Sequence, residues 1–205
     1  MDTDSPDTDS PDTDSPDSSK ILIRAVEQTG RIISGMGVGQ LSLSTPCTEW
    51  NVRDVVNHLI SSLHMFSQGA MGAKFNLEEF GVDRVKYDAA VSYAQEAAKL
   101  KIALGRAGVL DQDWDLAFGT PEGSLAVDIA IIEFVAHGWD IARATNSNVE
   151  LDPELARVAL ANARMLTTQF GRQEGVFADE LPAPEGADAY QRLAAFVGRD
   201  PLAVL

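Results

Sequence analysis

The sequence predicts an all-α protein, a bundle of long helices joined by mostly short links. Apolar residues recur at intervals of three and four positions after Ser19 and again in residues 52–66, which is the period of an amphipathic helix. Residues that favour helix starts, such as Asn51 and Asp152, stand directly before several of these segments. A convincing alternation of apolar and polar residues is missing, because the run at residues 40–44 is too short to indicate a strand.

The expected helices can be placed in order along the chain. The first runs from Ser19, where the apolar spacing begins, to the glycines at residues 35, 37 and 39. Asn51 is a favourable N-cap and Asp54 a favourable acid in the first turn of the second helix, which continues to about Gly69. The later helices are expected at residues 83–106, from residues 121–124 to 145, at residues 152–170 and at residues 187–197. Long helices with short links are typical of a four-helix bundle, here followed by a short C-terminal helical extension.

Negative charge is concentrated at the N-terminus. Residues 2–16 are three copies of Asp-Thr-Asp-Ser-Pro, and residues 1–19 hold seven aspartates and no lysine or arginine. The repeat has no apolar group to bury and repels itself, so we expect residues 1–19 to form a disordered tail. A solubilising extension is the simpler interpretation, and a tail that binds a basic partner is the alternative. Residues 20–205 are expected to form one helical domain.

The charge of the remaining chain argues against several classes of partner. The whole chain has a formal net charge of −15, and 24 acidic and 16 basic residues outside the tail leave −8 for residues 20–205. This charge argues against nucleic acid and anionic membrane surfaces, because both attract a basic surface. The lone Cys47 excludes an intrachain disulfide and a CxxC redox pair. With no secretory signal and no membrane-spanning apolar run, the chain is expected in the cytoplasm.

The fourth expected helix carries an acid in an apolar setting. Glu133 is flanked by Ile129, Ala130 and Phe134, so it is expected to be substantially buried. A buried carboxylate is costly unless it is paired or bound to a metal. His137 follows four positions later and therefore lies on the same face of the helix.

The second expected helix supplies a matching imidazole. His58 lies at the edge of its apolar face, beside the small residue Ser62, which leaves room for an ion and a ligand. Together His58, Glu133 and His137 form a set of two imidazoles and one carboxylate. Catalytic Zn²⁺ uses this set and keeps a fourth position open for water or substrate. The same set also suits Fe²⁺ or Ni²⁺.

A simpler interpretation needs no metal. Histidines in amphipathic helices are more often packed than metal-bound, and Glu133 has an alternative partner in Arg143. Asp140 either orients an imidazole or forms an i, i+3 ion pair with Arg143, and it is also a weak candidate for a catalytic base. His64 is turned by about 120° from His58 on the same helix, and it is expected to face solvent.

Two segments resemble the signatures of a known family. They are TPCTEWNVRDVVNHL at residues 45–59 and HGWDIARAT at residues 137–145. They resemble the DinB-like metal-binding proteins, in particular the actinobacterial branch related to mycothiol-dependent maleylpyruvate isomerase. The stretch from residue 175 to residue 201 is similar to the ending of that branch, so the resemblance covers about residues 20–201.

The resemblance implies a DinB-like four-helix bundle that holds a divalent metal, with His58, Glu133 and His137 in the ligand positions. It implies a metalloenzyme that depends on a low-molecular-weight thiol such as mycothiol and transfers that thiol to an electrophilic substrate or isomerises a double bond. The isomerase itself has a further C-terminal domain, whereas 35 residues follow Phe170 here. The resemblance therefore does not extend to maleylpyruvate isomerisation itself.

Two other functions are compatible with the same residues. One is a metal-dependent hydrolase in which water bound to the metal is the nucleophile. The other is a non-catalytic bundle, stabilised by metal, that acts as a sensor or interaction module. In each case the partners are expected to include neither nucleic acid nor membrane, and the chain is expected to be a monomer or a homodimer.

Overall fold

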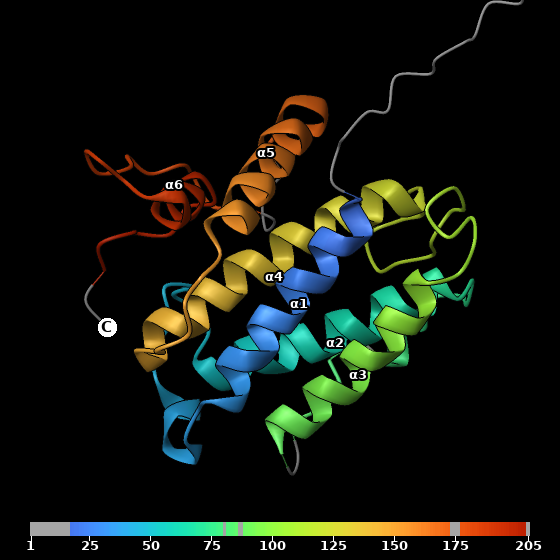
Figure 1. Cartoon of the computed structure of the whole chain (residues 1–205), viewed down its shortest axis with the longest axis horizontal. Helices are drawn as coiled ribbons and strands as arrows, with labels where there is room; N and C mark the ends of the chain where they lie inside the picture. The colour runs from blue at the N-terminus through green and yellow to red at the C-terminus, as the bar shows by residue number, and fades with distance from the viewer. Residues whose placement is uncertain (1–16, 80, 86–87, 173–176, 204–205) are drawn as a thin grey trace, which may run out of the picture.

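The computed structural model describes residues 17–79, 81–85, 88–172 and 177–203 (Figure 1). Within these residues the chain is helical and contains no strand, which confirms the all-α prediction. Most of the expected tail, residues 1–16, lies outside the described residues, as do residues 86–87 of the expected third helix and residues 175–176 of the expected family ending. The helices are α1 (Ser18–Ser34), η1 (Val38–Ser42), α2 (Val52–Ala70), η2 (Leu77–Glu79), α3 (Ala89–Leu104), α4 (Gly123–Thr145), α5 (Pro153–Phe170) and α6 (Ala189–Phe196).

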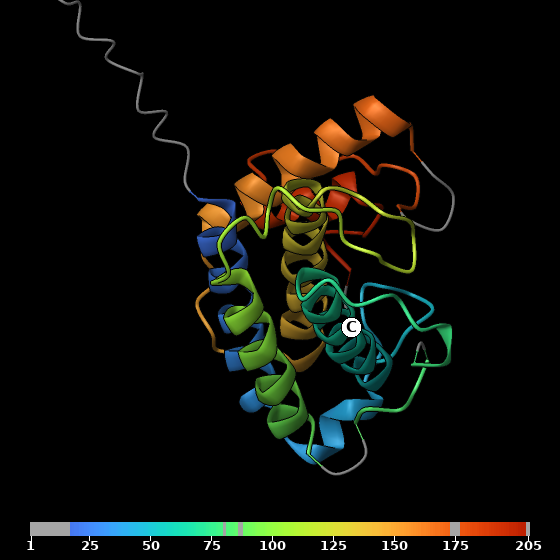
Figure 2. The ribbon, with the colours of Figure 1, turned by 90° about the vertical axis from the view of Figure 1, so that its right-hand side faces the viewer.

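The first four α-helices form the bundle. α1 packs against α4, α2 packs against both α3 and α4, and α1 also contacts α3. α5 lies against α4, and α6 packs on α5, so both form an extension outside the bundle on the α4 side (Figures 1 and 2). None of the described helices combines the length and the apolar character needed to cross a bilayer.

The helix starts follow the local signals, with one correction. Asn51 caps α2 as expected, and it forms a capping box with Asp54, in which each side chain accepts the backbone N–H of the other residue. The third helix was expected to begin at Asp83 but begins at Ala89. Asp88 is the residue that caps it, accepting two backbone N–H groups of the first turn. Asp83 instead lies in the preceding loop, where its carboxylate accepts hydrogen bonds from the guanidinium of Arg53 on α2.

The close approach of α1 and α4 depends on Gly138. A Cβ added at Gly138 would lie 2.5 Å from the hydroxyl oxygen of Thr29. That hydroxyl is buried and donates a hydrogen bond of 3.0 Å to the carbonyl oxygen of Phe134. The two helices therefore meet at a point that has no room for a side chain larger than hydrogen.

We expect Gly138→Ala to lower the free energy of unfolding by about 1–3 kcal/mol, because the core must shift to admit the methyl group. Urea unfolding measures this loss. Gly39→Ala is the matched control, since a Cβ there meets nothing within 4 Å. Thr29→Ala in the Gly138→Ala background should recover part of the loss. A Gly138→Ala protein more stable than the wild type would contradict the close approach, because alanine alone favours a helix.

Candidate metal centre

His58 of α2 meets Glu133 and His137 of α4 in the interior of the bundle. Each of the three residues offers one ligand atom, and these atoms all lie within 4.8 Å of one another. His58 Nε2 contacts Glu133 Oε1 directly. The ring centroids of the two histidines are 5.2 Å apart. The structure thus brings together the three side chains that the sequence singles out.

The cluster is open to solvent on one side. The side chains of His58 and Glu133 are 29% and 24% exposed, whereas that of His137 is 9% exposed. Ser62 donates a hydrogen bond of 3.1 Å to Glu133 Oε1. Arg143, the alternative partner of Glu133, instead donates to the carbonyl oxygen of Ala203. The alternative ion pair is therefore not formed, and the side chains of Glu133 and His58 each keep part of their surface exposed to solvent.

His58 and Glu133 stabilise each other in their charged forms. Burial by itself would raise the pKa of Glu133, but the imidazole of His58, followed by His137 and Ser62, holds it far below its usual range. Burial would likewise lower the pKa of His58, yet the charge of Glu133 and its hydrogen bond raise it.

Asp140 orients the imidazole of His137 through its Nδ1 nitrogen. It is fully buried and accepts a hydrogen bond of 2.9 Å from His137 Nδ1. Because Nδ1 is used in this way, Nε2 of His137 is the nitrogen available to a metal. Asp140 does not pair with Arg143, so of its two interpretations the structure favours orientation of the imidazole. Its complete burial favours this positioning role over that of a base in contact with substrate.

Arg199 completes this arrangement from the C-terminal segment that follows α6. Its Nε and Nη2 donate to the Asp140 carboxylate at 3.1–3.3 Å, and its Nη1 donates to the carbonyl oxygen of Val197. Burial would raise the pKa of Asp140, but His137 and Arg199 together lower it. Sequence reasoning missed Arg199, because only the folded chain brings it beside Asp140, 59 residues away.

Trp50 covers one side of both imidazoles. Its ring stacks on His137 with centroids 5.6 Å apart and lies tilted on His58 at 4.7 Å. The loop that carries it is fixed by Thr45, whose hydroxyl donates to the Trp50 carbonyl oxygen and accepts the Cys47 N–H. The contact of Trp50 with the site is a second feature that sequence reasoning missed.

Cys47 lies at the edge of the centre. Its sulfur and one ligand atom each of His137 and Asp140 are within 4.8 Å of one another. The side chain is half-buried and free of any disulfide. Burial raises the pKa of the thiol, and the charge of Arg199 opposes that rise.

His64 lies outside the centre, but its expected exposure was wrong. Its side chain is 17% exposed and lies between Glu79, at 2.5 Å from Nε2, and Glu96, at 3.2 Å from Nδ1. The segment that contains η2 folds back onto α2 and supplies Glu79, while α3 supplies Glu96. Helix geometry alone could not show that two other elements cover this face of α2.

The donor atoms of the centre fit a divalent ion. Two imidazole nitrogens and one carboxylate oxygen, with one imidazole held by a buried carboxylate, are typical of Zn²⁺ and also suit Fe²⁺ or Ni²⁺. His58, Glu133 and His137 would hold the ion. The exposed side of the cluster leaves room for an exchangeable ligand.

Comparison with known proteins gives two findings. The family profile described as mycothiol maleylpyruvate isomerase N-terminal domain matches residues 22–142. Two Mycobacterium tuberculosis proteins, from strains CDC 1551 / Oshkosh and H37Rv and both called uncharacterized, are each 30% identical over 178 residues. The aligned residues cover 86% of this chain and 94% of each relative. No solved structure matches the chain. The profile match covers His58, Glu133, His137 and Asp140 and ends before Arg199.

Proposed function

The chain belongs to the mycothiol maleylpyruvate isomerase N-terminal domain family, and on that basis we propose that it is a metalloenzyme that depends on a low-molecular-weight thiol of the mycothiol type. The reaction is transfer of the thiol to an electrophilic substrate, or addition and elimination that isomerises a double bond. The observation that carries the proposal is the convergence of His58, Glu133 and His137 in a cluster that is open on one side.

The ligand set suits thiol chemistry. Two neutral imidazoles and one carboxylate leave a divalent ion with net positive charge, and such an ion lowers the pKa of a thiol that coordinates it. Asp140 and Arg199 keep His137 in one orientation, so the position of its Nε2 does not depend on the bound molecule. Trp50 shields one side of both rings from water.

The burial of Asp140 and of Cys47 favours a thiol supplied from solution over hydrolysis and over an internal thiol. A metal-dependent hydrolase needs a base that can take a proton from the water bound to the metal. Asp140 is poorly placed for this, because it is fully buried behind His137. The thiol of Cys47 has a raised pKa because of its burial, which makes it a poor nucleophile by itself. A thiol supplied from solution needs neither an accessible Asp140 nor a reactive Cys47.

Binding of mycothiol to the Co²⁺-substituted protein tests this proposal. We expect a sulfur-to-cobalt charge-transfer band in the near ultraviolet when the reduced thiol is added. The S-methyl derivative should give no band, because it cannot provide a thiolate. His64→Ala is the matched control, since His64 is on the same helix outside the cluster, and it should behave as the wild type. If no band forms with mycothiol or any other low-molecular-weight thiol, the thiol-dependent function is wrong.

A further inference from the structure

Residues 189–203, which are α6 and the chain that follows it, bring one buried cation to the metal centre, and we call them the α6 segment. The cation is Arg199, whose side chain is only 12% exposed. Its Nε donates to both oxygens of the Asp140 carboxylate, and its Nη2 donates to Oδ2, the oxygen that also accepts the His137 Nδ1 hydrogen bond. The guanidinium therefore restricts rotation of the carboxylate that orients a metal ligand.

The end of α6 sets the direction of Arg199. α6 ends in a Schellman motif, in which the backbone N–H of Arg199 donates to the carbonyl oxygen of Ala194. The N–H of Gly198 makes the second bond of the motif, to the carbonyl oxygen of Ala195, and its φ is 82°. A Cβ at Gly198 would also lie 2.5 Å from the Cβ of Ala178. A side chain at position 198 would therefore displace Arg199.

The α6 segment is joined to the bundle at few points. α6 packs mainly on α5, which itself lies outside the bundle, and touches α4 less (Figure 1). In the described residues, the hydrogen bonds between the segment and the bundle are those from Arg199 to Asp140, from Arg143 to the carbonyl oxygen of Ala203 and from Gln28 to Tyr190. A unit held by few contacts can open while the rest of a protein stays folded. Docking of the segment and orientation of His137 thus depend on one shared contact.

We propose that docking of the α6 segment and metal binding are coupled, with Arg199 as the positioning residue that links them. In the docked state Arg199 holds Asp140, and His137 presents its Nε2 to the ion. In the undocked state Asp140 lacks these donors, so the imidazole is no longer fixed. An ion that binds more tightly to the docked state favours docking by the same factor. This coupling rests on the metal centre of the proposed function, but not on its thiol-dependent reaction.

Metal affinity of Arg199 variants tests one direction of the coupling, by calorimetric titration of the full chain with Zn²⁺. Arg199→Met should weaken binding about tenfold, the lower end of the roughly 10- to 100-fold cost of losing a direct imidazole partner. Arg199→Lys keeps the charge without the planar fork, so it should lose less. Helix content by circular dichroism at the titration temperature checks that both variants are folded. Unchanged affinity in folded Arg199→Met would overturn the proposal.

Gly198→Ala tests the same link without changing a charged residue. It should weaken Zn²⁺ binding, because the displaced Arg199 no longer reaches Asp140 in the same geometry. Gly186→Ala is the matched control: Gly186 has φ of 71°, and a Cβ there meets nothing within 4 Å. It strains the backbone in the same left-handed region on the other side of α6, so its Zn²⁺ affinity should equal that of the wild type. Equal affinities of the two glycine variants would contradict the coupling.

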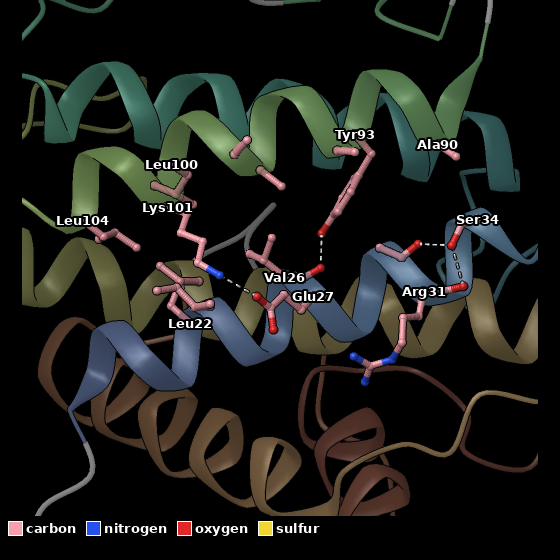
Figure 3. A pocket seen from close by; sticks show the side chains of 15 residues that line it. Leu22, Val26, Glu27, Arg31, Ser34, Ala90, Tyr93, Leu100, Lys101 and Leu104 are labelled. Atoms are coloured by element: carbon pink, nitrogen blue, oxygen red, sulfur yellow. Dashed lines mark hydrogen bonds and ion pairs between the residues drawn. The ribbon is translucent and has the colours of Figure 1, made fainter.

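Hydrogen exchange tests the opposite direction. Zn²⁺ should slow backbone amide exchange in the α6 segment by the factor that Arg199→Met loses in affinity, about tenfold. α3 is the internal comparison, because the groove of about 530 Å³ that it lines with α1 includes no ligand of the centre (Figure 3). Its exchange should not change, and in His137→Ala the α6 segment should not respond either.

The outcomes separate the coupling from the metal centre itself. A wild type that binds Zn²⁺ and shows equal exchange in the α6 segment with and without the ion would overturn the coupling alone. A wild type that binds no divalent ion would overturn both the coupling and the metal centre. Zn²⁺ binding together with slowed exchange, in a protein that forms no complex with any low-molecular-weight thiol, would support the coupling and reject the thiol-dependent reaction.

Discussion

His137→Ala is expected to lose stoichiometric metal, whereas the wild type binds one equivalent of a divalent ion. His137 supplies one of three donor atoms that lie within 4.8 Å of one another. Loss of a group that only supports a ligand costs about 10- to 100-fold in metal affinity, so loss of the ligand itself should cost more than about 100-fold. Elemental analysis of the purified proteins and calorimetric titration with Zn²⁺ measure the effect.

Thermal unfolding provides an independent readout of the same site. A ligand present at 100 to 1,000 times its dissociation constant stabilises the folded state by about 2.7–4.1 kcal/mol. Zn²⁺ should therefore raise the melting temperature of the wild type and leave that of His137→Ala unchanged. Glu133→Gln keeps the shape of the side chain and should lose the shift as well. His64→Ala should retain it, and a His137→Ala protein that still binds one equivalent would rule out this centre.

Asp140→Ala is expected to cause the largest loss of stability. It removes the partner of Arg199, whose side chain is only 12% exposed, and leaves a buried cation without a carboxylate. Breaking a buried pair in this way costs about 3–5 kcal/mol, which corresponds to a fall in melting temperature on the order of 10 °C for a chain of this length. Chemical denaturation at neutral pH measures the loss.

The matched variant is Asp140→Ala combined with Arg199→Met. It removes both charges, so it should be more stable than Asp140→Ala alone and recover a substantial part of the loss. Both Asp140 variants should bind metal 10- to 100-fold more weakly at temperatures where they are folded, because His137 is no longer held. Unchanged metal affinity would mean that Asp140 serves stability alone.

The contribution of Asp140 also has a defined pH dependence. Its pKa is lower in the folded protein than the ordinary value of about 3.9 in an unfolded chain. The stabilisation is therefore fully present above the unfolded pKa and is lost as the pH falls through the folded value. The difference in unfolding free energy between the wild type and Asp140→Asn should be constant near neutrality and shrink in acid. A constant difference down to pH 2 would contradict the buried ion pair.

Local patterns predicted the helices well, because their signals come from neighbouring residues. The capping box of Asn51 and Asp54 and the start of α5 after Asp152 are present as expected. The start of α3 was placed too early, because Asp83 and Asp88 are both suitable caps, and the contact of Asp83 with Arg53 joins residues that are distant in sequence.

Local sequence patterns were enough to predict the all-α fold and to place Glu133 and His137 on one helix face, because residues four positions apart in a helix share a face. The sequence alone could not show that His58 lies near Glu133 and His137, because this depends on how α2 packs against α4. In the structure the ligand atoms of the three residues lie within 4.8 Å of one another. Only the tertiary structure could also bring Arg199 to Asp140 and enclose His64 between two glutamates. These contacts join segments far apart in the chain, so their geometry depends on how whole helices pack.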